Sequence, residues 1–298
     1  MKQIIAFLRF YRLRVMAAVG TAGAAAVLLL RLVLTPTLRD PDTGRFAANL
    51  AAIITSLALL LLLAGMTLAA NRERVDIGGK AALPASLATL LSGVVLLVSS
   101  LWEAVAWLAY DAVPAPAPAA LTLLPVAMVA LTLLCGVAAG GALMAFGLQI
   151  TAEDGTRRGM RTVSCLLPVL WVWLRLARYE MSYVSAVSLK DSYFTFAMYI
   201  FELLFLFKLA RFVSGIGDTR PATVLFFAMG AAMLTLTAPL FRIGMVLAGD
   251  AQAYHSTELA GSPDAALGLL ALVFGWALAF GRAAPSEDAT DSSETSQA

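Results

Sequence analysis

The chain has 298 residues, of which 60% are hydrophobic and 13% are charged, and its mean hydropathy is +0.84. A soluble domain has about 45–50% apolar and about 25% charged residues, so this composition excludes an ordinary water-soluble protein. The net charge of +2 is too small to indicate nucleic-acid binding, and the basic residues lie in short clusters between apolar runs. We therefore expect an integral membrane protein whose main partner is the lipid bilayer.

Long apolar stretches follow one another along almost the whole chain. A run of about 18 or more apolar residues matches the hydrocarbon core of a bilayer. The fifth stretch is short and contains Pro168, so it is either a complete kinked span or a re-entrant segment. The sequence predicts an all-α, polytopic transmembrane bundle of about eight helices without a soluble domain. The predicted spans are Val15–Leu34, Phe46–Ala70, Ala81–Tyr110, Ala119–Ile150, Thr162–Leu176, Tyr193–Val213, Ala222–Leu247 and Ala265–Phe280.

The two ends of the chain differ from this single transmembrane domain, which covers residues 15–283. Residues 1–14 mix large apolar and basic side chains, as in a helix that lies in the cytoplasmic interface of a membrane. Residues 284–298 are rich in Ser, Thr, Asp and Glu and contain no large apolar residue, which predicts a disordered acidic tail.

The distribution of basic residues predicts the orientation. Cytoplasmic segments of membrane proteins carry an excess of lysine and arginine. With the N-terminus inside, 14 of the 21 lysines and arginines fall in inner segments. This bias predicts a plasma (inner) membrane protein with both termini cytoplasmic. If the fifth stretch is re-entrant, every later segment changes sides and the C-terminus lies outside. The other basic residues are Arg31 and Arg242 within spans and Arg39, Arg45, Arg175, Arg178 and Lys190 in outer segments.

The informative charged residues within the predicted spans are Arg31, Glu103, Glu202 and Arg242. Each ionised side chain at a helix centre costs about 2.5–3.5 kcal/mol on insertion scales, so these residues should be paired or hydrated. Arg31 and Arg242 lie near outer helix ends, where they either anchor the helix by snorkelling or pair with an anion. Glu103 has a shorter reach, so we expect it to face a partner or water.

Glu202 is the strongest candidate for a functional group. Asp191, Thr195, Tyr199 and Glu202 follow one another at spacings of 4, 4 and 3 residues, which places them on one helical face. This polar stripe descends from the outer surface to the middle of the membrane. It is either a hydrogen-bonded packing seam with a protonated Glu202, since burial disfavours the charged form, or a pathway for a solute or a proton.

Small residues predict two helix-packing faces. Gly136 and Gly140, followed by Gly141, form one such face, and Ala17, Gly20 and Ala24 form another. Helices in lipid associate mainly by close packing, which small residues permit.

No enzymatic site is evident in the sequence. The phosphate-binding loop, His-Glu-x-x-His, Cys-x-x-Cys and Gly-x-Ser-x-Gly motifs are absent, and His255 is the only histidine, so we expect no cofactor and no metal centre. Gly215-Ile216-Gly217-Asp218 resembles the Gly-x-Gly-Asp motif of intramembrane aspartyl proteases, and Tyr110-Asp111 resembles their Tyr-Asp motif. In that family two aspartates meet inside the membrane, whereas here they are predicted on opposite sides.

The sequence therefore favours a non-enzymatic membrane component, such as a sensor, scaffold or assembly subunit with protein partners that remain unknown. The alternative is a secondary transporter or channel that uses the Glu202 stripe for a small solute or ion. An intramembrane aspartyl protease is a remote third interpretation. Because the costly charges lie mostly in the outer half, any site should open outward.

Overall fold

The computed structural model describes the backbone of residues 2–34, 41–68, 75–76, 81–110, 119–151, 161–182, 189–214, 220–247 and 262–283. Side chains are described for residues 11–30, 53–67, 81–108, 126–150, 164–180, 195–214, 220–237, 240 and 262–281. Each of the eight predicted apolar stretches contains a helix, which confirms the all-α class. The helices are α1 (Lys2–Leu34), α2 (Pro41–Leu68), α3 (Ala82–Tyr110), α4 (Ala119–Thr151), α5 (Arg161–Ser182), α6 (Leu189–Ser214), α7 (Pro221–Leu247) and α8 (Ser262–Phe280).

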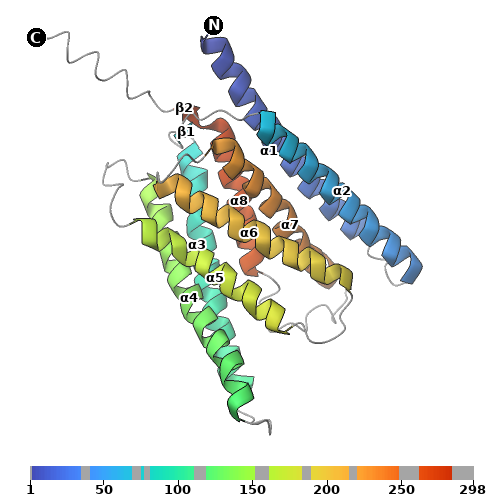
Figure 1. Cartoon of the computed structure of the whole chain (residues 1–298), viewed down its shortest axis with the longest axis vertical. Coiled ribbons are helices and arrows are strands. Elements are labelled where there is room, and N and C mark those ends of the chain that lie inside the picture. The colour runs from blue at the N-terminus through green and yellow to red at the C-terminus, as the bar shows by residue number, and fades with distance from the viewer. Residues whose placement is uncertain are drawn as a thin grey trace, which may run out of the picture.

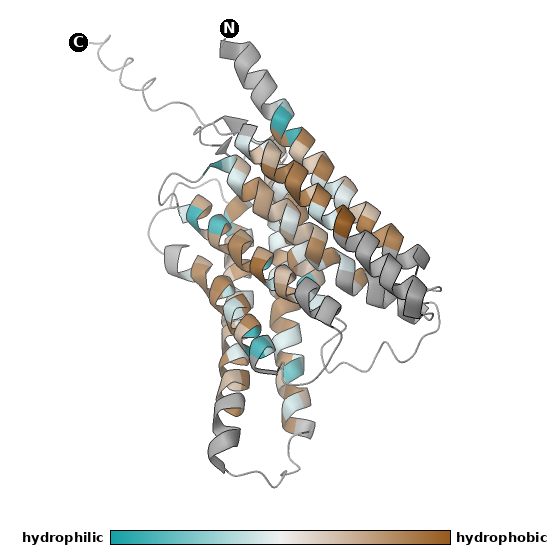
Figure 2. Ribbon diagram, turned by 45° about the vertical axis from the view of Figure 1, so that its right-hand side comes forward, coloured by the Kyte–Doolittle hydropathy of each residue, from teal (hydrophilic) through white to brown (hydrophobic). Residues whose placement is uncertain are grey.

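Four of these helices are long and apolar enough to cross a membrane within the described residues: α1, α3, α4 and α8. The described apolar parts of α2 and α7 are shorter. Large apolar side chains such as Leu57, Leu101 and Leu134 are exposed on the helices, and Figure 2 shows hydrophobic residues along most of their length. Such a surface suits lipid rather than water, so the chain is a membrane-embedded protein.

Neighbouring helices run in opposite directions, and the two ends of the bundle can be told apart (Figure 1). Two short strands, β1 (Val75–Asp76) and β2 (Arg282–Ala283), pair antiparallel and join the start of α3 to the end of α8. We call this the strand end of the bundle and the opposite one the far end. The described start of α1 also lies toward the strand end, since the guanidinium of Arg14 lies 4.6 Å from the ring centre of Phe280.

Helices α3 to α8 close into a ring. Each of them packs against the next along the chain, and α8 returns to pack against α3. The buried apolar side chains of all six helices form one core inside this ring. α1 and α2 lie outside it, where α1 packs on α7 and α8 and α2 packs mainly on α1 (Figure 1).

Small residues bring the helices close together, as the sequence predicts. A Cβ atom added to Gly140 would lie 2.8 Å from the carbonyl oxygen of Gly93, and one added to Gly136 would meet Ser100 and Trp171. On α1, a Cβ atom at Gly20 would lie 2.5 Å from the Cβ atom of Met229 on α7. Close packing is therefore confirmed at Gly136, Gly140 and Gly20, whereas a Cβ atom added to Gly141 would have no neighbour within 4 Å, so Gly141 does not belong to the packing face.

Two helices, α1 and α5, differ most in extent from their predicted spans. α5 continues through Pro168 and reaches Ser182, six residues beyond the predicted end at Leu176. Its 22 residues correspond to about 33 Å, and it runs as one helix toward the far end rather than turning back. α1 begins at Lys2, so the segment predicted to lie in the membrane interface continues directly into the first apolar helix. The predicted disordered tail, residues 284–298, lies outside the described residues.

Candidate functional site

A buried ion pair joins α5 to α8 inside the ring. Arg175 Nη1 donates to Asp264 Oδ1, and Arg175 Nη2 donates to Asp264 Oδ2 over 3.4 Å. Both side chains are only 9% exposed. The Arg175 guanidinium also lies 4.7 Å from the ring centre of Trp171 and 5.0 Å from that of Tyr199. Two-point hydrogen bonding and two aromatic faces together hold this arginine in one orientation.

Local sequence explains why Asp264 occupies this position. Ser262, Pro263 and Asp264 form the first turn of α8, where a proline is tolerated and a carboxylate is favoured by the unpaired backbone N–H groups. The Ser262 hydroxyl lies 3.1 Å from that of Ser99 on α3, which is 11 residues before the end of α3. α8 therefore begins beside a point on α3 about 16 Å before the end of that helix, and Asp264 in the first turn of α8 is buried.

Glu202 lies beside this ion pair. It occupies the middle of α6, 13 residues after Leu189 and 12 before Ser214, and is 1% exposed. Neither carboxyl oxygen has a hydrogen-bond partner among the described residues. The charges of Asp264 and Arg175 both act on Glu202, and Tyr199, under the Arg175 guanidinium, precedes it by one helical turn.

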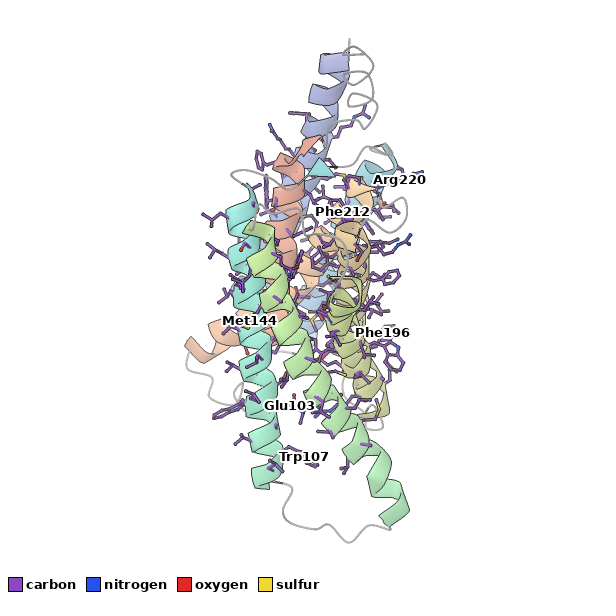
Figure 3. The ribbon with its side chains drawn as sticks, turned by 90° about the vertical axis from the view of Figure 1, so that its left-hand side faces the viewer. Glu103, Trp107, Met144, Phe196, Phe212 and Arg220 are labelled. Atoms are coloured by element: carbon purple, nitrogen blue, oxygen red, sulfur yellow. The ribbon has the colours of Figure 1, made fainter. Side chains whose placement is uncertain are left out.

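A second ion pair lies one turn nearer the far end. Arg178 on α5 donates to Glu103 on α3. These side chains are 35% and 25% exposed, so this pair is more open than the Arg175–Asp264 pair. Figure 3 shows Glu103 and Trp107 toward the far end of α3, away from Phe212 and Arg220 near the strand end.

Aromatic side chains fill the interior on the strand side of Glu202. Phe205 follows Glu202 by about one turn and packs against Phe274 of α8, with ring centres 6.5 Å apart. Phe212 packs against the other side of Phe274 at 6.4 Å. The polar centre is thus bordered by aromatic rings toward the strand end and by a second ion pair toward the far end.

The structure brings together some of the predicted site residues. Tyr199 and Glu202 both face the interior, and Thr195 is partly buried on the same helix. Glu103 does have a charged partner, as expected, but it belongs to the more exposed pair. The side chains of Asp191, Arg31 and Arg242 lie outside the described residues, as does His255.

Sequence reasoning missed the two residues that define the centre. It places Arg175 in an outer segment and gives Asp264 no role, whereas both are buried in helices. Trp171, Arg175 and Tyr179 are spaced by four residues, which would have indicated a single polar and aromatic face on α5. For Asp264 the only signal is its position in the first turn of a helix, which is common for acidic residues.

The helix arrangement does not support the resemblance to intramembrane aspartyl proteases. Asp111 and Gly215–Asp218 lie outside the described residues. The helices that precede them, α3 and α6, end at opposite ends of the bundle (Figure 1). The two motifs thus follow helix ends separated by the length of the bundle.

The chemistry available at this centre is that of two carboxyl groups and one guanidinium with little exposed surface. A separate apolar cavity of about 20 Å³ between α4, α5 and α6 is lined by Cys165, Pro168 and their neighbours and includes no charged residue. The polar centre can therefore pair charges and hold protons, while the cavity adds no polar chemistry. No protein-family model, curated protein sequence or solved structure matches this chain.

Proposed function

We propose that this chain is a multi-pass membrane protein whose eight helices cross the bilayer and which carries a small solute or ion, with Glu202 as the essential group. The observation that supports this function best is a fully buried carboxyl group without a hydrogen-bond partner, placed beside a buried ion pair. Ionisable groups inside membrane helix bundles are costly and typically mark ion or substrate pathways.

The closed ring supports the same proposal. Its six helices surround Glu202, while aromatic rings separate this residue from the strand end. Toward the far end, the centre is bordered by the partly exposed Arg178–Glu103 pair. This arrangement corresponds to the outward-opening state of a carrier. In this proposal the strand end, with both termini, is cytoplasmic, because basic residues are concentrated in the segments predicted to lie there.

The direct test is uptake into vesicles that contain the purified protein. We expect Glu202→Gln to abolish uptake of the transported solute or ion while the amount of folded protein is unchanged. Glu180→Gln is the matched control, because Glu180 is an exposed glutamate on α5. If the parent protein moves nothing across a broad panel and Glu202→Gln only lowers the folded amount, Glu202 is a packing residue and the transport proposal fails.

Eight membrane crossings can be tested separately with single cysteines in a variant that lacks Cys135 and Cys165. We expect a membrane-impermeant thiol reagent to label Ala115→Cys and Ser185→Cys from outside intact cells. Gly155→Cys should react only after the cells are opened. Labelling of positions 155 and 185 from the same side would show that α5 does not cross the membrane.

A second candidate function is that of an assembly subunit. α1 and α2 lie outside the ring, and α2 carries exposed apolar residues such as Ile53, Leu57 and Leu60. This face is available to lipid or to another membrane protein. Mass measurement of the protein in native lipid particles shows which of these covers the face, since an assembly subunit is recovered with partner chains at fixed stoichiometry.

A further inference from the structure

The centre contains more carboxyl groups than cations. The charges of Arg175 on α5 and Asp264 on α8 both act on Glu202. The other charged residues described on helices of the ring are Arg178 and Glu180 on α5, Glu103 on α3, and Lys208 and Arg211 on α6, with Arg220 just before α7. Arg178 and Glu103 pair with each other, and Lys208, Arg211 and Arg220 lie toward the strand end, six or more residues beyond Glu202. The described part of α7, residues 221–237, has no charged residue. Among the described residues, one guanidinium therefore serves the two carboxyl groups of the centre.

Burial requires this group of three to be neutral. A charge held in a low-dielectric interior without a counter-charge is strongly unfavourable. Arg175 neutralises one carboxylate, so the other must carry a bound cation. In the observed arrangement both nitrogens of the guanidinium fork are directed to Asp264, and Glu202 has no partner. Glu202 is thus the carboxyl group that requires the cation.

The surroundings favour a proton over a metal ion as this cation. Among the described residues there is no group of three or more His, Cys, Asp or Glu side chains that could hold a metal. A hard metal cation such as Ca²⁺ requires about six to eight oxygen ligands. A proton requires only the carboxyl oxygen to which it is bonded.

We propose that Glu202 and Asp264 share one exchangeable proton and that Arg175 alternates between them as the counter-ion. When Glu202 carries the proton, Arg175 pairs with ionised Asp264, as observed. When the O–H bond of Glu202 breaks and the proton transfers to Asp264, Arg175 moves to ionised Glu202. Both states contain one proton, one carboxylate and one guanidinium, so neither leaves a net charge in the interior.

The geometry supports such an exchange. The Arg175 guanidinium lies over the ring of Tyr199, one turn from Glu202 on the same helix, so a move to Glu202 exchanges its hydrogen bonds to Asp264 while the guanidinium stays near this ring. Asp264 is 6% exposed and Glu202 is 1% exposed, so Asp264 is the member of the pair that is nearer to water. Protons would enter and leave through Asp264 from the far end, beside the Arg178–Glu103 pair. This inference rests on the proposed function, in which Glu202 is the essential group, and it identifies the ion coupled to transport as a proton.

The test uses infrared difference spectroscopy and stability of the full chain in lipid. The parent protein should show the carbonyl band of one buried protonated carboxyl group, which shifts in heavy water. Glu202→Gln should lose this band. Asp264→Asn should lose it too, because Glu202 then ionises to pair with Arg175, and the protein should remain folded.

The double variant Asp264→Asn/Glu202→Gln leaves Arg175 without a carboxylate and should lower the folded yield by about tenfold or more. Adding Arg175→Gln to this double variant restores neutrality and should recover most of that yield. If Asp264→Asn keeps the carboxyl band and loses as much folded protein as the double variant, Glu202 is a fixed neutral residue and the proposal is overturned. Neither readout requires transport. A shared proton without uptake would therefore refute the carrier alone, and uptake without the band would refute the shared proton alone.

Discussion

Two ion pairs lie one turn apart on α5, and they have the same chemistry in different surroundings. Arg175 and Asp264 are each 9% exposed, and two aromatic rings cover the arginine. Arg178 and Glu103 are 35% and 25% exposed. Burial strengthens the attraction between charges but also removes their hydration, so a buried pair is costly to break, whereas an exposed pair contributes little.

The difference also bears on function. Among the described residues, the buried pair has a third ionisable group, Glu202, on which both of its charges act. A third charge near the exposed pair would be screened by water and ions, so its protonation would not need to be linked to the pair. In the interior the charges of all three groups must balance together. Burial therefore couples the protonation of the carboxyl groups at this centre to which of them is paired with Arg175.

The largest effect should come from making the same substitution in both pairs. Arg175→Gln leaves the buried Asp264 carboxylate without its counter-ion, and we expect it to lower the free energy of unfolding by about 3–5 kcal/mol. Arg178→Gln should lower it by less than about 1 kcal/mol, because solvent screens that pair. Unfolding by a denaturing detergent in mixed micelles measures both values. Equal losses in the two variants would remove the distinction between the pairs.

A substitution that keeps the charge separates charge from geometry. Arg175→Lys preserves the cation but loses the two-pronged contact with Asp264 and the flat group that packs on Trp171 and Tyr199. We expect a loss of about 1.5–3 kcal/mol, the range for a hydrogen bond to a charged group. Arg178→Lys should be close to neutral in the same mixed-micelle titration. A neutral Arg175→Lys variant would show that charge alone holds the buried pair.

The positions of the helices could be predicted from the sequence because lipid imposes a simple rule on length and apolarity. α3 was predicted to within one residue at its start, and α7 likewise. The end of α5 was wrong by six residues because Arg175, Arg178 and Glu180 lower the apolarity of the segment, although the helix continues through them.

The site could be predicted only in part. Glu202 stands out because it is a single charged residue in the middle of an apolar helix. Arg175 and Asp264 lie toward the ends of their apolar stretches, where charged residues are ordinary and carry little information. Their pairing joins positions 89 residues apart in the chain and depends on how α5 and α8 pack within the ring. That packing cannot be inferred from periodicity along either helix.

The smallest expected effect concerns the carboxylate of the exposed pair. Glu103→Gln keeps the shape of the side chain and removes its charge, so we expect the free energy of unfolding to fall by about 0.2–1 kcal/mol at low ionic strength. Near 1 M salt the screening length is about 3 Å, and the difference from the parent protein should disappear. The effect of Arg175→Gln should persist under the same conditions, because salt does not enter the interior. If the Glu103→Gln effect is as large at high salt as at low salt, the Arg178–Glu103 pair is shielded from the solvent. The difference between the two ion pairs would then come from their neighbouring residues rather than from burial.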